Sequence, residues 1–407
     1  MEKFYNKPVN LFYSFLFIFI IMVPVNSGLL IKLVACVFLF IIWLLYFLGS
    51  KLSFKTRADT SLKSECFFRK RRYVLLLIII QTFASIYAGQ FYTGLSFLEA
   101  LNNLLSGDSN YSLYQQYFMD SGLKSFSLDK ILPILSNFYV KLIFIYILYF
   151  FLVHSSKKID IYLVFLSALP MVIMSAFRGT NFELFEIFVA LICAFYVKSK
   201  LTGAVFPLLK LSLFGSFLIF IYVFQILLRY KFEYNINCNN EYCYDYNSIL
   251  HSVSPPLAST LYKLSGYFYF APDYMARWFI YFLEESLLLT TILPGNDLLY
   301  GYEGKWLCID NLRCGPTWAP DFEIYTYIFG VPATFILIMI YSSFQHLLVK
   351  TATMNFIDFL GFYLITLQFF SFPVGNFLFV SSANKLLVIL FIVLYSLRFL
   401  SKKRVIA

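Results

Sequence analysis

Long apolar segments alternate with short polar ones along most of the 407 residues. A helix that crosses a bilayer needs about 20 mostly apolar residues. On that basis the pattern predicts about ten transmembrane helices. Their expected ranges are 9–25, 29–49, 73–93, 133–153, 159–177, 182–197, 205–229, 325–346, 356–374 and 377–397. The first run lacks a small-residue cleavage site, so we interpret it as a retained helix and not as a signal peptide.

The basic residues predict an orientation for these helices. With both termini in the cytoplasm, the cytoplasmic segments hold 19 Lys and Arg residues and the outer segments hold 8. Cytoplasmic loops of membrane proteins carry this kind of excess. We therefore expect both termini to be cytoplasmic.

The composition agrees with lipid as the solvent. Hydrophobic residues make up 60% of the chain and charged residues only 13%, which is too little polar surface for a soluble protein of this length. The net charge of +10 is explained by the cytoplasmic excess of basic residues, so nucleic-acid binding is not expected. We predict an all-α integral membrane protein with a single polytopic domain over residues 1–407.

Two outer segments are longer than a helix connection needs. The first covers residues 94–132. The second covers residues 230–324, carries five basic and eleven acidic residues, and is rich in Tyr, Phe and Trp. Disordered segments lack such aromatic content, so we expect this large loop to fold. Its apolar stretch at 278–293 is expected to form an interfacial helix along the membrane surface.

Four of the seven cysteines fall in the large loop, at Cys238, Cys243, Cys308 and Cys314. In an oxidising compartment they permit two disulfides, whose pairing the spacing leaves open. The spacings are not those of zinc sites and the chain has only three histidines, so no metal is expected.

The signatures of nucleotide and hydrolase sites are missing. The chain has no phosphate-binding loop of the Walker type, no glycine-rich dinucleotide turn, no G-x-S-x-G and no H-E-x-x-H. We expect no cofactor, and ATP-driven transport by this chain alone is not indicated.

The segment 174–186 places charges at an expected outer helix junction. Arg178 precedes a helix that begins with Glu183 and Glu186, three residues apart and therefore on one face. Charges at this depth are costly and are often functional. An arginine near a helix N-terminus is a suitable phosphate site, and an interfacial pair that anchors the hairpin is the alternative.

Three clusters in or beside the large loop have similar alternatives. Arg229 ends the seventh apolar run and is either a membrane anchor or a ligand contact. Asp273 and Arg277, four apart, form either a helix-surface pair or a carboxylate and a guanidinium for one ligand.

The third cluster and one histidine complete the candidates. Trp318, Asp321 and Glu323 precede an expected helix, as a binding lip or as a helix cap. His251 is the one histidine in the expected outer segments and is a candidate base, although a structural role is more typical.

These features together resemble a known family. The chain has about ten helices, an Arg178–Gly179 element at an outer junction, and a large late loop. That loop ends in the run from Thr317 to Pro320, followed by Tyr327-Ile-Phe-Gly330. The pattern resembles bacterial O-antigen polymerases of the Wzy type and, more distantly, the O-antigen ligases.

The resemblance implies a membrane glycosyltransferase with a GT-C-like architecture in the bacterial inner membrane. It would transfer a growing glycan from undecaprenyl pyrophosphate to the next lipid-linked repeat at the periplasmic face, without a metal. A flippase and a chain-length regulator would be its partners. In this sequence the catalytic arginines would be Arg178 and Arg277, with Arg229 and Arg313 in reserve.

That chemistry suits the residues present. A polyprenyl pyrophosphate leaves readily but needs charge stabilisation, which arginine supplies. A carboxylate or histidine must accept the proton of the acceptor hydroxyl. We therefore assign Arg178, Arg277, Asp273 and Glu183 as candidate catalytic residues. The candidate substrate-binding residues are Arg229, Arg313, Trp318, Asp321, Glu323 and His251.

Two other functions stay open at this point. An O-antigen ligase belongs to the same broad class, and His251 slightly favours it. A lipid-linked oligosaccharide flippase is a transporter, which usually has more helices and shorter loops than this chain. The sugar, the linkage and the identity of the base do not follow from the sequence.

Overall fold

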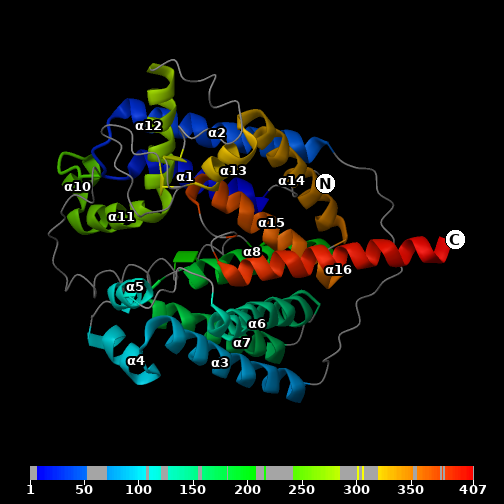
Figure 1. Cartoon of the computed structure of the whole chain (residues 1–407). Helices are drawn as coiled ribbons and strands as arrows, with labels where there is room; N and C mark the ends of the chain where they lie inside the picture. The colour runs from blue at the N-terminus through cyan, green and yellow to red at the C-terminus, as the bar shows by residue number, and fades with distance from the viewer. Residues whose placement is uncertain are drawn as a thin grey trace. The chain divides into compact units, whose positions relative to one another are not determined.

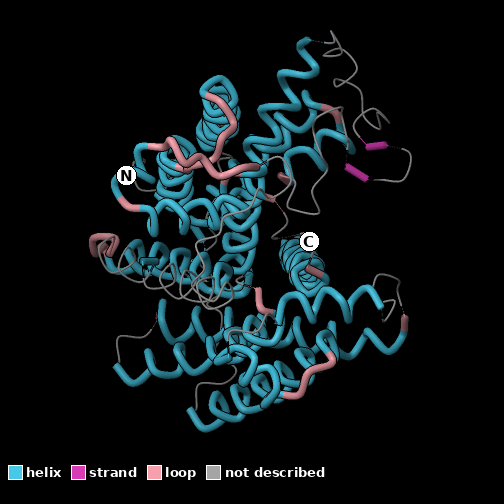
Figure 2. The backbone as a smooth tube through the Cα atoms, turned by 90° about the vertical axis from the view of Figure 1, so that its left-hand side faces the viewer, coloured by secondary structure: helices cyan, strands magenta, loops and turns pink. Residues whose placement is uncertain are grey.

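The computed structural model describes residues 7–52, 71–106, 110–120, 127–154, 158–180, 182–207, 215–216, 242–284, 300–301, 305–306, 320–351, 355–375, 378 and 381–406. The described backbone is almost entirely helical, as Figures 1 and 2 show. Within it, two antiparallel two-residue strands pair, β1 (Tyr300–Gly301) and β2 (Lys305–Trp306). The expected all-α class is therefore confirmed in its main feature.

The chain divides into two compact units that interleave along the sequence. Unit 1 comprises Met1–Thr56, Tyr234–Leu347 and Ile365–Leu378, and unit 2 comprises Arg57–Glu233, Leu348–Leu364 and Phe379–Ala407. The division into two units does not test the expected single polytopic domain, which stays a prediction.

Unit 1 contains the two N-terminal helices and the helices of the large loop. Its elements are α1 (Lys7–Met22), α2 (Leu29–Lys51), α10 (Ile249–Val253), α11 (Pro255–Phe268), α12 (Phe270–Glu284), α13 (Asp321–Phe329), most of α14 (Val331–Thr351) and the second half of α15 (Phe356–Val374). α12 packs against α2 and α11, and α1 packs against α2.

Unit 2 contains the middle of the chain and its C-terminal helix. Its elements are α3 (Arg71–Thr93), α4 (Phe97–Ser106), α5 (Asn110–Asp120), η2 (Leu128–Lys130), α6 (Ile131–Ile147), the π-helical η3 (Leu148–Val153), α7 (Lys158–Arg178), α8 (Phe182–Thr202), the first half of α15 and α16 (Ser382–Ile406). α3 packs against α6 and α7, and α16 packs against α6.

Six helical segments of the described chain are long and apolar enough to cross a membrane. They are Leu29–Lys51, Arg71–Thr93, Leu128–Val153, Asp160–Arg178, Val331–Thr351 and Phe356–Val374. A chain with six such helices is a multi-pass membrane protein. The expected count of ten stays a prediction: α1 is shorter, α8 carries four charged side chains, and most of 205–229 lies outside the described residues.

Small residues allow the helices of unit 1 to approach closely. A Cβ atom on Gly49 of α2 would lie 2.4 Å from the carbonyl oxygen of Met339 on α14. Beside it, Ser342 and Ser343 donate to the carbonyls of Tyr46 and Gly49 at 2.5 and 2.6 Å. Small side chains and hydroxyl-to-carbonyl bonds are the usual means of helix association in membranes.

In unit 2, polar side chains donate to backbone carbonyls of neighbouring helices, one of them in a π-helical turn. Gln81 donates to the carbonyls of Val140 and Ser167 at 2.8 and 3.0 Å. Lys198 donates at 2.8 Å to the carbonyl of Leu152 in the π-helical turn. Without water in a bilayer, irregular backbone needs partners of this kind.

The two segments expected on the outer side are more structured than simple loops. Residues 94–132 contain α4 and α5. In the large loop, the stretch expected at 278–293 does not begin a helix of its own. Its first seven residues form the second half of α12, which starts at Phe270, and residues 285–293 lie outside the described residues. The start of the expected helix is therefore corrected by eight residues, while its interfacial position stays a prediction.

Candidate functional site

The junction between α7 and α8 in unit 2 holds Arg178. This residue ends α7, and Gly179 follows with a φ of 59°. A Cβ atom on Gly179 would lie 2.6 Å from the backbone nitrogen of Tyr111. Both the positive φ and this close approach require glycine, so the turn that directs Arg178 depends on it.

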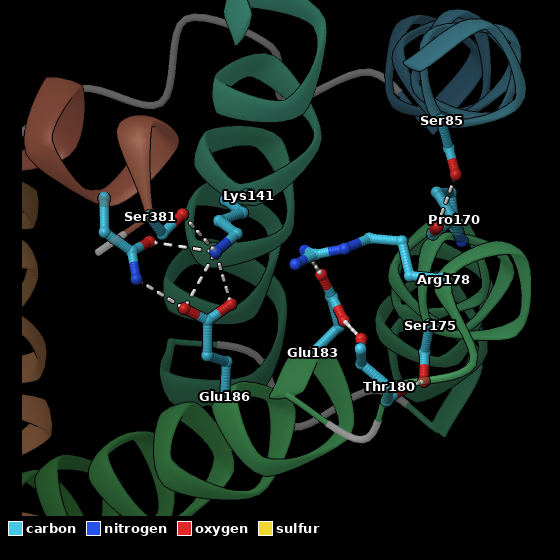
Figure 3. A network of polar contacts seen from close by, with 10 residues as sticks. Ser85, Lys141, Pro170, Ser175, Arg178, Thr180, Glu183, Glu186 and Ser381 are labelled. Carbon is cyan, nitrogen blue, oxygen red and sulfur yellow. Dashed lines mark hydrogen bonds and ion pairs between the residues drawn. The ribbon is translucent and has the colours of Figure 1, made fainter. Parts of the chain in front are cut away.

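Arg178 is held by Glu183. Its Nη1 lies 2.7 Å from Glu183 Oε1, and Thr180 donates at 3.2 Å to the other carboxylate oxygen, as Figure 3 shows. The Arg178 side chain is 23% exposed and that of Glu183 1%. The guanidinium also lies 5.2 Å from the ring centroid of Tyr114, so its position is restricted by an ion pair and an aromatic face.

Glu186 is on the same helix face as Glu183 but has a different cation. Lys141 of α6 lies 2.8 Å from Glu186 Oε1 and 2.6 Å from Oε2. Asn384 and Ser381, at the start of α16, accept from the same ammonium at 3.0 and 3.4 Å. Lys141 is 2% exposed and Glu186 is fully buried, so the pair connects three helices of unit 2 (Figure 3).

Asp273 and Arg277 form the corresponding pair in unit 1, on α12. Arg277 Nε lies 2.7 Å from Asp273 Oδ2, and the side chains are 21% and 0% exposed. The spacing of four residues forms the pair, but its carboxylate is buried and not on the helix surface, and a role of both groups toward one ligand stays a prediction. Packing of α12 against α2 and α11 decides this burial.

The second oxygen of Asp273 is also occupied. Tyr269 donates to Asp273 Oδ1 at 2.7 Å and shares a further short hydrogen bond with Ser27. Burial and the Asp273 charge raise the pKa of Tyr269 above its ordinary value, so the phenol remains a donor. Arg277 itself lies 5.8 Å from the ring centroid of Tyr242. These contacts orient the arginine.

Two carboxylates open α13. Asp321 accepts from Gln368 Nε2 at 3.0 Å. Glu323 accepts at 3.3 Å from the hydroxyl of Tyr274 on α12. Burial raises the pKa of Glu323 to about 8, and the Tyr274 bond lowers it only in part. An acid with this pKa is mainly neutral at pH 7 and exchanges its proton near neutral pH.

His251 lies in α10 and contacts Tyr244. The Tyr244 hydroxyl and His251 Nδ1 are 2.7 Å apart, and the backbone nitrogen of His251 donates to Ser248. Pro24 and Asn26 bond to the backbone of the same 243–245 segment. Among the described contacts, those of His251 fold the loop onto itself.

Several candidates fall outside the described residues. These are Arg229, Arg313, Trp318, Cys238, Cys308 and Cys314. Cys243 is disulfide-bonded, and its partner is not one of the described cysteines, of which Cys36 and Cys193 are free. Within the described ranges no group of three or more His, Cys, Asp or Glu side chains could hold a metal ion.

The structure brings together some candidates that the sequence only suggested. Arg178 meets Glu183 in unit 2, and Asp273 meets Arg277 in unit 1. The sequence does not single out Tyr274 and Tyr269 as site residues, because tyrosines are so common in this chain that none stands out. Lys141 had a usable signal, since an isolated lysine in an apolar run needs a partner.

Comparison with known proteins gave no match: no protein-family model, no curated protein and no solved structure matches this chain.

Proposed function

We propose that this chain is a membrane glycosyltransferase that polymerises lipid-linked oligosaccharide repeats. It would transfer the growing glycan from undecaprenyl pyrophosphate to a hydroxyl of the next lipid-linked repeat. In this proposal the chain has ten spans in a bacterial inner membrane, with both termini in the cytoplasm.

One observation carries the proposal. Arg178 and Arg277 each lie partly exposed, at 23% and 21%, on a carboxylate that is at most 1% exposed. A buried carboxylate fixes the guanidinium while part of the arginine side chain remains accessible. Fixed cations suit a reaction in which negative charge develops on a pyrophosphate leaving group.

Glu183 and Asp273 therefore act best as positioning residues. Each already accepts two hydrogen bonds, one of them from its arginine. Both oxygens of each carboxylate are therefore engaged in contacts within the protein. The proton acceptor is then to be sought in another residue.

Purified full-length protein tests the proposal directly. It is given undecaprenyl-pyrophosphate-linked repeats, and product length is measured by gel electrophoresis. We expect chains of many repeats from the wild type and a loss of about 10²–10³-fold in rate for Arg178→Ala and for Arg277→Ala. Wild-type protein that makes no chains from these repeats would overturn the proposal.

The chain offers a matched control. Arg398 of α16 lies 2.8 Å from Asp358, with side chains 15% and 1% exposed, which repeats the arrangement at the expected cytoplasmic side. Arg398→Ala removes an equivalent pair, so we expect normal chain length from it. A loss as large as that of Arg277→Ala would mean that these pairs only support the fold.

A flippase is the second candidate, and the Lys141–Glu186 pair favours it. Buried ion pairs inside a membrane segment often belong to transport pathways. A deletion strain separates the candidates through its lipopolysaccharide. Loss of a polymerase leaves single repeats on the core, loss of a ligase leaves the core bare, and loss of a flippase leaves no repeats.

A further inference from the structure

Glu323 differs from the other buried acids of the described chain. Glu183, Glu186, Asp273, Asp358 and Asp160 each lie within 3.2 Å of an Arg or Lys nitrogen. Asp321 accepts from an amide. Glu323 is fully buried, and the one side-chain donor to it among the described residues is a phenol.

The two oxygens of Glu323 are not equivalent. Oε1 accepts from Tyr274 at 3.3 Å, and no donor among the described residues reaches Oε2, which is itself buried. A carboxylate with an unsatisfied buried oxygen is costly in its charged form. Such a group is retained most readily where it takes up and releases a proton.

Tyr274 connects this buried acid to the arginine pair. It follows Asp273 directly on α12 and precedes Arg277 by three residues, so it lies within one helical turn of both. Its side chain is partly exposed, whereas that of Glu323 is not. The phenol therefore extends from the surface of α12 to the buried carboxylate.

We infer that Tyr274 and Glu323 form a proton relay that accepts the proton of the acceptor hydroxyl. The inference rests on the proposed glycosyltransferase function. Glu323 in its ionised form, the minor form at pH 7, is the final acceptor. Tyr274 is the group that meets the sugar, and Arg277 stabilises the leaving pyrophosphate.

The acceptor oxygen forms a bond to the anomeric carbon of the donor glycan, while the bond from that carbon to the pyrophosphate oxygen breaks. The electron pair of the broken bond leaves with the lipid pyrophosphate. The hydroxyl proton passes to the oxygen of Tyr274 as the phenol's own proton passes to Glu323 Oε1. Before the next turnover the proton leaves Glu323 through Tyr274, whose partly exposed side chain passes it to water.

Two substitutions in the full-length enzyme test the relay, with lipid-linked repeats as substrate. We expect Glu323→Gln and Tyr274→Phe each to lower the turnover rate by about 10²–10⁴-fold. Binding of the lipid-linked repeat is expected to change by less than about threefold, because neither group holds the pyrophosphate. Both replacements keep the shape of the side chain.

Controls in the same unit distinguish chemistry from folding. Tyr341→Phe removes a hydroxyl that lies 3.3 Å from that of Tyr325 on α13, and Glu284→Gln changes an exposed acid at the end of α12. We expect both to retain wild-type turnover. All four variants are checked for folding by their thermal unfolding in detergent.

The outcomes of these measurements separate failure of the relay from failure of the proposed function. Wild-type turnover in Glu323→Gln overturns the relay while the polymerase function stands. Loss in Glu323→Gln with full activity in Tyr274→Phe overturns the passage through the phenol. If Glu323→Gln fails to fold, full activity in a folded Tyr274→Phe still overturns the relay. Absence of chains from the wild type overturns the proposed function, and the relay with it.

Discussion

Two glutamates among the described residues are fully buried, and their surroundings are opposite. Glu186 in unit 2 has the ammonium of Lys141 within 2.8 Å and an amide donor from Asn384. Glu323 in unit 1 has a single phenolic donor at 3.3 Å among the described residues. The charge of Glu186 is offset by the ammonium of Lys141, whereas Glu323 is neutralised most easily by taking up a proton.

The difference separates structural from chemical uses of a buried acid. A carboxylate that holds a cation and an amide connects helices, and its loss leaves a buried charge without a partner. A carboxylate without a cation has a raised pKa and can exchange a proton near pH 7. We therefore expect changes at Glu186 to affect mainly stability and changes at Glu323 to affect mainly chemistry and pH dependence.

The largest expected effect is the dependence of stability on pH that Glu323 causes. Its pKa rises from 4.5 to about 8 on folding, which at about 1.4 kcal/mol per unit is on the order of 5 kcal/mol. Because the folded state keeps a proton that the unfolded state loses, this stability is present below pH 4.5 and is lost as the pH rises to 8. Thermal unfolding of the wild type and Glu323→Gln at several pH values measures it. Relative to the wild type, the variant is expected to become more stable as the pH rises from 5 to 8. An equal dependence of unfolding free energy on pH in both proteins would contradict the raised pKa of Glu323.

Breaking the Lys141–Glu186 pair comes next. Lys141→Ala leaves a buried carboxylate without its cation, so we expect a loss of about 3–5 kcal/mol in the free energy of unfolding. Lys141→Met combined with Glu186→Leu removes both charges and is expected to restore most of this loss. A double variant as unstable as the single one would show that the charges themselves are not the cause.

A smaller effect is expected at Asp273. Asp273→Asn keeps the shape but weakens the hold on Arg277 and leaves the phenol of Tyr269 with a poorer acceptor, at a cost of about 1–3 kcal/mol. The polymerisation rate is expected to fall through the misplaced arginine. Unfolding and chain-length assays on the same sample check both effects, and a loss of stability without any loss of rate would remove Arg277 from the site.

The smallest expected effect on stability is that of Tyr274→Phe. It removes one long hydrogen bond, so we expect a loss of about 0.5–1.5 kcal/mol. The same bond lowers the pKa of Glu323, and its removal is expected to move the pH-dependent transition of stability to higher pH. A transition at lower pH would contradict the assigned direction.

Much of the helical organisation could be predicted from the sequence. The expected segments 29–49, 73–93 and 356–374 correspond to α2, α3 and α15 within two residues at each end. Membrane-length apolar runs determine this, because a backbone in lipid must satisfy its own hydrogen bonds. Residues 94–132 and 278–293 were predicted less well, since short amphipathic helices lack that constraint.

Of the candidate site, only the ion pairs between residues close in the sequence could be predicted. Asp273 and Arg277 are four residues apart, and Arg178 and Glu183 flank one turn, so local spacing was enough to connect them. The partners of Glu186 and Glu323 come from residues 45 and 49 positions away. No local pattern indicates contacts at such separations.

The sequence by itself therefore determined a helical, multi-pass chain and the short-range ion pairs, because hydrophobic length and helical periodicity act locally. Only the tertiary structure decided which acids have a cation. Helix packing brings Lys141 to Glu186, whereas Glu323 has only a phenol among the described residues, and burial makes that difference in partners decide how each negative charge is offset.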